Sequence, residues 1–261
     1  MSTRVAYLGP KGTYAEKAAK ALVALEKLDS PNFTPCKGLR SVVDSLANNL
    51  CDAAVVPIEN SVEGGVTTTL DALWRNKNIF IHRALVLPIK HALMSDGTIS
   101  TVSEVLSHPQ AIAQCSQWLN DNIPHAVHLP TNSTAEAIRM VRGSSFRAAI
   151  GSKDSSKELN ILSYPINDIE GNCTRFVLLS KDNIKVDGNK ASIAFSLKSN
   201  SPGALLKALN CIANLGLNMS RIESRPSKRE LGEYVFFIDL DLNSSNKKDF
   251  ETITEELSSL C

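Results

Sequence analysis

The chain has 261 residues, of which 43% are hydrophobic and 21% are charged, and its formal net charge is +1. This length and composition fit one large globular domain or two modest ones. A nearly neutral chain has no global field that would recruit nucleic acid or an anionic membrane, and no apolar run approaches the ~20 residues of a membrane-spanning helix. The N-terminus enters a strand-like run without the features of a signal peptide, so we expect a cytoplasmic protein.

The cysteines and histidines give no sign of a metal site or a disulfide framework. The six cysteines form no CxxC pair, and the five histidines match no zinc-binding pattern. We therefore expect reduced thiols and no bound metal.

Strand-like apolar runs alternate with helical patterns through about residue 180, which predicts an α/β fold. Two capping boxes, Thr13 with Glu16 and Ser133 with Glu136, mark helix starts. The expected strands cover residues 5–8, 53–57, 105–107, 148–151 and 174–179. The expected helices begin or lie at residues 13–28, 41–49, 109–119 and 133–141.

This order predicts a first domain over residues 1–182 with two lobes, the second lobe covering about 85–168. An apolar run at 79–87 carries the chain out of the first lobe, and the strand at 174–179 returns to it. Two α/β lobes joined by crossing connections leave a cleft between them. Such clefts, lined by the C-terminal ends of strands, are the usual ligand sites.

The last seventy residues have a different pattern. A polar linker at 181–190 precedes a second domain at 190–261. Within that domain the elements come in the order strand, helix, strand, strand, helix, which is typical of a ferredoxin-like α+β module whose last strand is not evident. The strands are expected at 191–198, 218–225 and 234–242, and the helices from 201 and over 248–260.

The segment 171–179 places a hydroxyl and a guanidinium side by side at the start of a buried strand, in Thr174 and Arg175. A fixed pair of this kind suits the binding of a carboxylate and the delivery of a proton. The alternative is that Arg175 forms a structural ion pair with an acid of the same cleft, while Thr174 is an ordinary strand residue.

Four short motifs and two tail motifs occur in one order along the chain, and together they resemble the prephenate dehydratase family followed by an ACT regulatory domain. The resemblance covers essentially the whole chain. The motifs are Gly9-Pro10-Lys11-Gly12-Thr13-Tyr14, Pro57-Ile58-Glu59-Asn60-Ser61, Ser107-His108-Pro109-Gln110-Ala111, Thr174-Arg175-Phe176, Gly203-Ala204-Leu205-Leu206 and Glu223-Ser224-Arg225-Pro226.

The resemblance implies that prephenate loses carbon dioxide and water to give phenylpyruvate, without a cofactor or a metal. It implies a periplasmic-binding-protein-like catalytic region, feedback inhibition by L-phenylalanine through the tail, and a homodimer or homotetramer. We expect no chorismate mutase segment of the kind that some members carry ahead of this region. The alternatives are an arogenate dehydratase and a non-catalytic phenylalanine sensor, while a transporter's solute-binding protein would need an export signal.

The resemblance implies catalytic roles for four residues. Thr174 is the expected donor to the leaving hydroxyl, and Asn60 offers an amide to the substrate. Glu59 is a second proton donor if burial raises its pKa, or else a solvated residue of an Asx turn. Gln110, at a helix start, is expected to face a carboxylate. His108 is expected to cap that helix rather than to act as an acid.

A further set is expected to bind the substrate, although helix capping alone would also explain its threonines and Ser133, and an Asx-type turn would explain Ser61. Thr67, Thr68 and Thr69 are not distinguished by sequence, and Phe176 is more readily explained as a core residue. The set is Arg175, Ser61, Thr67, Thr68, Thr13, Ser133 and Phe176.

In the tail, a helix N-terminus at Gly203 suits the carboxylate of an amino acid, and Asn218 suits its ammonium group. Leu205 and Leu206 would face its ring, although one of these two leucines is expected in the core. Binding between two tails would make inhibition a property of a dimer. The expected effector residues are Gly203, Ala204, Leu205, Leu206, Asn218, Glu223 and Ser224.

Overall fold

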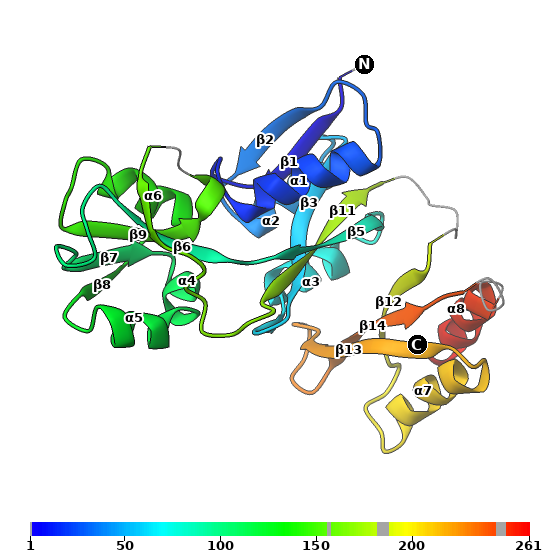
Figure 1. Ribbon diagram of the computed structural model, residues 1–261. Coiled ribbons are helices and arrows are strands. Elements are labelled where there is room, and N and C mark those ends of the chain that lie inside the picture. The colour runs from blue at the N-terminus through cyan, green and yellow to red at the C-terminus, as the bar shows by residue number, and fades with distance from the viewer. Residues whose placement is uncertain (1, 156–157, 182–187, 244–248) are drawn as a thin grey trace. The chain divides into compact units, whose positions relative to one another are not determined.

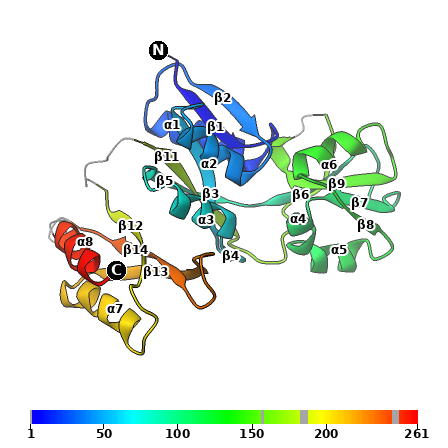
Figure 2. The same cartoon turned by 180° about the vertical axis from the view of Figure 1, so that it is seen from behind.

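A computed structural model describes residues 2–155, 158–181, 188–243 and 249–261. The chain divides into two compact units, Met1–Asp182 and Asn183–Cys261, which can be followed in Figures 1 and 2. Most of the linker expected at 181–190 lies outside the described residues, since 182–187 are among those not described.

The first unit contains a sheet with the strand order β2-β1-β3-β11-β5, to which the short β4 adds beside β3. The strands β1, β2 and β3 are parallel, whereas β11 runs antiparallel between β3 and β5. The late strand β11 therefore returns to the first lobe, as the sequence predicts. The strands are β1 (Arg4–Leu8), β2 (Asn32–Cys36), β3 (Ala53–Asn60), β4 (Gly64–Gly65), β5 (Phe80–Pro88) and β11 (Cys173–Ser180).

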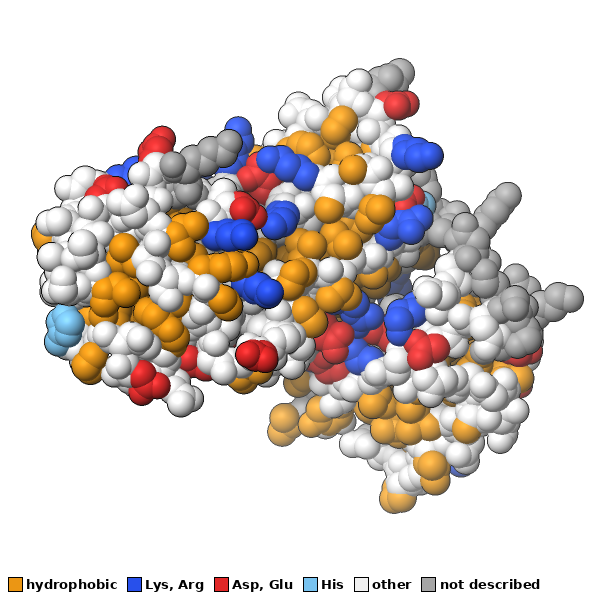
Figure 3. All heavy atoms as spheres, viewed as in Figure 1, with side chains coloured by type: hydrophobic (Ala, Val, Ile, Leu, Met, Phe, Trp, Pro, Cys, Tyr) orange, Lys and Arg blue, Asp and Glu red, His pale blue; other side chains and the backbone are white. Residues whose placement is uncertain are grey.

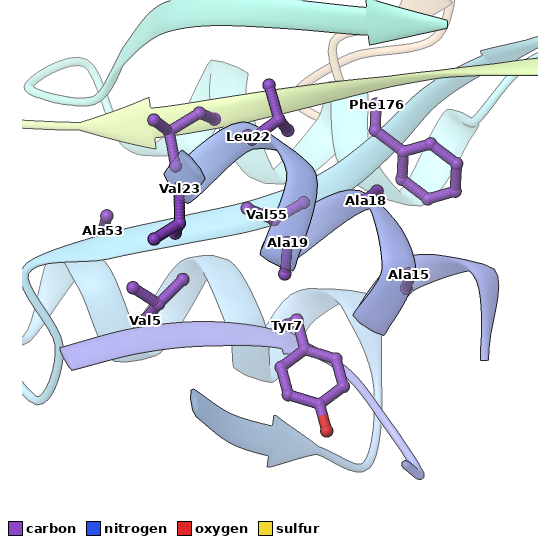
Figure 4. Close-up of a cluster of buried hydrophobic side chains, with 11 residues drawn as sticks. Val5, Tyr7, Ala15, Ala18, Ala19, Leu22, Val23, Ala53, Val55 and Phe176 are labelled. Carbon is purple, nitrogen blue, oxygen red and sulfur yellow. The ribbon is translucent and has the colours of Figure 1, made fainter. Parts of the chain in front are cut away.

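Helices cover both faces of this sheet, α1 (Tyr14–Leu25) on one and α2 (Leu39–Ala47) with α3 (Thr67–Arg75) on the other. The buried positions of α1 recur with helical spacing, and the helix presents them to β1, β3 and β11. Figure 4 shows this cluster, to which α1 contributes Leu22 and β11 contributes Phe176. The packing fixes the sheet end that carries the candidate site.

A second sheet forms the other lobe, with the order β10-β6-β9-β7-β8. Its core combines buried aliphatic side chains of the strands with those of the helices that follow β7. The elements are β6 (His91–Ser95), β7 (Glu104–Ser107), α4 (Pro109–Ala113), α5 (Ser116–Asn122), β8 (Val127–Pro130), α6 (Thr134–Val141), β9 (Arg147–Ser152), the 3₁₀ turn Lys153–Ser155 and β10 (Asn160–Ser163).

Two expectations for the lobes differ from the structure. The single helix expected at 109–119 is two short helices, because Asp168 accepts the backbone N–H groups of Gln117 and Trp118 and so starts α5 separately. The run expected to leave the first lobe is β5, which pairs with β11 along its length, so the first lobe extends to Pro88. The sequence does not predict the strands β2, β4, β6, β8 and β10.

The second unit is an α+β module whose three antiparallel strands have the order β12-β14-β13. Its helices pack on one face around a buried aliphatic cluster. Together with the two-lobed α/β unit, this confirms the predicted fold class, and no fourth strand lies beside β12 among the described residues. The elements are β12 (Lys190–Ser196), α7 (Ala204–Asn214), β13 (Asn218–Pro226), β14 (Tyr234–Asp241) and α8 (Asp249–Leu260).

A close backbone contact in the second lobe predicts a sharp sensitivity to substitution. A Cβ atom on Gly97 would overlap the carbonyl of Ser145, so we expect Gly97→Ser to lower the free energy of unfolding by about 1–3 kcal/mol. Gly38→Ser is the matched control, because a Cβ there meets no atom closer than 3.9 Å and serine is a favourable residue before α2. Urea unfolding measures both, and equal stabilities would contradict the prediction.

Candidate active site

The pairing of β11 with β3 brings together residues that are far apart in the sequence. Thr174 lies opposite Asn60, and Arg175 lies opposite Glu59. The exposed fraction is only 9% for Thr174 and 5% for Asn60. A buried hydroxyl and a buried amide therefore face each other where β3 ends.

The amide of Asn60 organises this point. Its Nδ2 atom donates to Thr174 Oγ1 at 3.0 Å, to Asn172 Oδ1 at 2.9 Å and to the carbonyl of Cys173 at 3.1 Å. Its Oδ1 atom accepts the backbone N–H groups of Val62 and Glu63. Asn60 thus makes the Asx turn that was the alternative reading and also holds the hydroxyl of Thr174.

The donor from Asn60 defines what the Thr174 hydroxyl can do. Because Oγ1 accepts this hydrogen bond, its own proton is left for another acceptor, and none is found among the residues that the structure describes. The same N–H group stabilises negative charge that develops on Oγ1 when the proton leaves. The arrangement suits a hydroxyl that delivers a proton to a bound molecule.

Polar side chains of the second lobe continue this network. Gln114 Oε1 accepts from Asn172 Nδ2 at 2.9 Å and lies 3.0 Å from His91 Nε2. Gln114 Nε2 donates to Glu63 Oε1 at 2.7 Å, and Gln110 Nε2 donates to Glu63 Oε2 at 2.6 Å. The two lobes of the first unit are therefore joined through these amides.

A cavity of about 480 Å³ lies against this network, which is the size of a small-molecule site. Both lobes contribute to it. Its lining residues are Val62, Glu63, Pro109, Gln110, Ala113, Gln114, Asn167, Asp168, Ile169 and Asn172.

Arg175 forms an ion pair with Glu59, with Nη2 2.9 Å from Oε2. The ion pair is the alternative that the sequence left open for Arg175. It gives Glu59 the task of holding the guanidinium, rather than that of a proton donor. The ion pair fixes the guanidinium of Arg175 in one orientation, and a planar guanidinium is the group that best matches a carboxylate.

Neither Arg175 nor the other predicted substrate residues are among the residues that line the cavity. Thr13 and Ser133 accept the backbone N–H groups of Glu16 and Glu136, so they are helix caps. Thr67 and Thr68 are exposed at the start of α3. Helix capping, the alternative to substrate binding, is therefore the role that the structure shows for Thr13 and Ser133.

Three neighbouring predictions also have structural outcomes. Phe176 is 3% exposed within the α1 cluster, so the core alternative replaces the predicted substrate contact. Ser61 Oγ accepts the backbone N–H of Cys173 and thereby ties β3 to β11. His108 Nδ1 accepts the backbone N–H of Gln110, the capping role expected for it.

Four residues of the network were not predicted from sequence: Glu63, His91, Gln114 and Asn172. The spacing of residues could have indicated two of them. Gln114 lies one helical turn beyond Gln110, and Asn172 lies two residues before Thr174 on an extended chain, so each shares a face with a predicted site residue. Glu63 and His91 carry no such signal, because their partners come from other elements.

In the second unit, the predicted effector residues divide into packed and exposed ones. Gly203 has φ +81° at the start of α7, Leu205 packs against the core, and Leu206 is 59% exposed. Asn218 Nδ2 donates to Asp241 Oδ2 at 2.7 Å, so its amide is already engaged. Glu223 pairs with Arg221 at 2.6 Å. The adjacent Gly203-Ala204 and the exposed Ser224 remain predictions for the effector site.

No group of three or more His, Cys, Asp or Glu side chains is placed to hold a metal ion in the part of the chain that the structure describes. None of the described helices is long and apolar enough to cross a membrane.

The fold and site define a class: two-lobed α/β proteins in which polar side chains of both lobes border a cavity of small-molecule size. A sequence model of prephenate dehydratase matches residues 5–184. The chain belongs to the prephenate dehydratase family, as its motifs predict.

Relatives cover almost the whole chain. The chain is 39% identical to a prephenate dehydratase of Methanocaldococcus jannaschii, and the alignment covers 98% of this chain and 94% of that protein. The solved prephenate dehydratase of Arthrobacter aurescens in complex with L-Phe superposes with a TM-score of 0.85 at 32% identity, covering 96% of this chain and 85% of that one. The enzyme of Staphylococcus aureus Mu50 gives a TM-score of 0.81 at 27% identity, covering 98% and 96%.

Burial of His91 predicts a pH-dependent stability. Burial lowers its pKa. When the pH falls below the ordinary histidine pKa of about 6.5, His91 therefore binds a proton in the unfolded chain but not in the folded one. Stability therefore falls as the pH drops, by up to about 1.4 kcal/mol per pH unit from this group. In urea unfolding at pH 7.5 and 5.5, we expect His91→Gln to lose less stability than the wild type. His128→Gln is the control, and a His91→Gln slope equal to that of the wild type would refute the prediction.

Proposed function

We propose that this chain converts prephenate to phenylpyruvate by loss of water and carbon dioxide. Family membership and the names of the relatives support this activity. The single structural observation behind it is the Thr174 hydroxyl, held as an acceptor by Asn60 with its own proton left to donate.

The chemistry of prephenate explains what such a site must supply. The substrate is a dianion whose ring hydroxyl leaves as water once it gains a proton. The electrons of the breaking bond to the ring carboxylate replace those of the departing oxygen, carbon dioxide leaves, and the ring becomes aromatic. Thr174 gives the proton and regains one from solvent, so one proton is consumed for each turnover. Expulsion of hydroxide without this proton is slow.

The substrate's carboxylates require donors. Arg175, aligned by Glu59, offers a guanidinium for one of them, and the amide of Gln110 borders the cavity that would receive the other. Figure 3 shows lysine and arginine side chains on the face of the first unit covered by α1, with aspartate and glutamate side chains among them. Two lysines of α1 are ion-paired, Lys17 with Asp154 and Lys20 with Glu16, so the proposed binding of a dianion relies on individual donors rather than on a broad positive field.

Thr174→Ala removes the proposed proton donor and leaves a small strand residue in its place. We expect kcat for phenylpyruvate formation, followed by the absorbance of its enolate, to fall by ~10²-fold or more. Thr69→Ala is the control, since that hydroxyl donates to the carbonyl of Pro57 and not to the site. A wild-type kcat in Thr174→Ala would show that Thr174 takes no part in proton transfer. Running arogenate beside prephenate separates the alternative substrate, which carries an amino group in place of the keto group.

We also propose that the second unit is an ACT-type regulatory domain that binds L-phenylalanine between two copies of the chain, in a cytoplasmic homodimer or homotetramer. The relative from Arthrobacter aurescens was solved in complex with L-Phe. In this chain, Leu206 is exposed beyond the core that Leu205 joins, and Ser224 is exposed on β13, an edge strand of its sheet. Exposed apolar groups beside an edge strand suit a site completed by a second copy.

Leu206→Ala tests this effector site. Losing apolar contact with the phenylalanine ring should raise the phenylalanine concentration for half inhibition by roughly fivefold or more, each variant being compared with its own uninhibited rate. Leu231→Ala is the matched control, because Leu231 is fully exposed in the same unit but lies outside the predicted effector residues. An unchanged half-inhibitory concentration in Leu206→Ala would place the ring elsewhere.

A further inference from the structure

The network beside Thr174 closes into a ring. Glu63 N–H donates to Asn60 Oδ1 at 3.1 Å, and Asn60 Nδ2 donates to Asn172 Oδ1 at 2.9 Å. Asn172 Nδ2 donates to Gln114 Oε1 at 2.9 Å, and Gln114 Nε2 donates to Glu63 Oε1 at 2.7 Å. Every bond runs in the same direction, and Thr174 is attached to the ring through Asn60.

We propose that Glu63 is a positioning residue for the proposed reaction: it closes this ring and sets the direction of its hydrogen bonds, so that the Thr174 hydroxyl is held with its proton toward the substrate. The inference rests on the proposed function. The carboxylate of Glu63 acts through Gln114 and Asn172 on Asn60, and we assign it no contact with the reacting atoms.

The direction follows from the chemistry of Glu63. A carboxylate only accepts, whereas the backbone N–H of the same residue only donates. An amide has its donor and acceptor at opposite ends, so Gln114, with Nε2 on the carboxylate, must turn Oε1 toward Asn172. Asn172 then presents Oδ1 to Asn60, whose Nδ2 also reaches Thr174.

A side branch supports the same direction. His91 Nε2 faces Gln114 Oε1 at 3.0 Å and must therefore be the donor. The other ring nitrogen, Nδ1, is buried with no hydrogen-bond partner among the described residues, which fits the neutral tautomer protonated at Nε2. If Gln114 were turned around, its NH₂ group would face the N–H of His91 and the NH₂ of Asn172.

The ring also joins the lobes. Asn60, Glu63 and Asn172 belong to the end of the first sheet, while Gln114 follows α4 of the second lobe. Glu63 Oε2 takes a second amide of that lobe, Gln110 Nε2, at 2.6 Å. One carboxylate on a short turn therefore holds α4 by two charge-assisted hydrogen bonds, which are the stronger kind.

Two substitutions separate the acceptor from the charge. Glu63→Ala removes both acceptor oxygens, so Gln114 loses the partner that orients it. Glu63→Gln keeps one acceptor oxygen for Gln114, and Gln110, which lies outside the ring, accommodates the new NH₂ by turning its amide. Glu170→Ala is the matched control, because Glu170 is an exposed acid on the segment between the lobes with no place in the ring.

The measurement is steady-state kcat and KM for prephenate in the full chain. We expect Glu63→Ala to lower kcat by roughly 10- to 100-fold while KM changes by less than about threefold, the effect of misplacing a catalytic group. Glu63→Gln and Glu170→Ala should stay within about threefold of the wild-type kcat. The near-normal Glu63→Gln variant excludes misfolding as the cause, since it shares the altered position.

Three outcomes overturn the inference. They are a wild-type kcat in Glu63→Ala, an equal loss in Glu63→Gln and Glu63→Ala, and a loss confined to KM, which would make Glu63 a substrate contact. A wild-type chain that is inactive on prephenate removes the proposed function, and the inference with it. An active wild type with an unaffected Glu63→Ala removes the inference alone.

Discussion

The antiparallel pairing of β11 with β3 is the interaction on which the site depends. It places residue 174 opposite residue 60 and residue 175 opposite residue 59, across more than one hundred residues of sequence. Both strands are buried between α1 on one face and α2 with α3 on the other, so their register is held by apolar packing on two sides. A slip of one residue would turn Thr174 away from Asn60.

The same pairing explains why a weakly acidic hydroxyl suits proton transfer here. A threonine in water would rotate freely and bond to solvent. In this site the amide of Asn60 fixes the oxygen, and Asn60 is itself oriented by backbone N–H groups at one end and by Asn172 at the other. Preorganised donors of this kind need no rearrangement during the reaction, which is the main source of electrostatic catalysis.

The two units divide the proposed tasks by the kind of structure that each task needs. A two-lobed α/β unit offers strand ends and a cavity with polar groups from both lobes, which suits a small dianion. A small α+β unit with an edge strand and exposed apolar residues suits association with a second copy. An effector bound there can influence the first unit only by binding one arrangement more tightly than another.

Local patterns in the sequence determined the fold class, the helix caps at Thr13 and Ser133, the strand at 174–179 and the family, because capping, periodicity and motifs act over a few neighbouring residues. Tertiary structure alone decided that Arg175 pairs with Glu59, that Phe176 is core, and that Glu63, Gln114 and Asn172 form a ring with Asn60. These partners come from different strands and helices, and only the folded arrangement brings their polar atoms within hydrogen-bond distance.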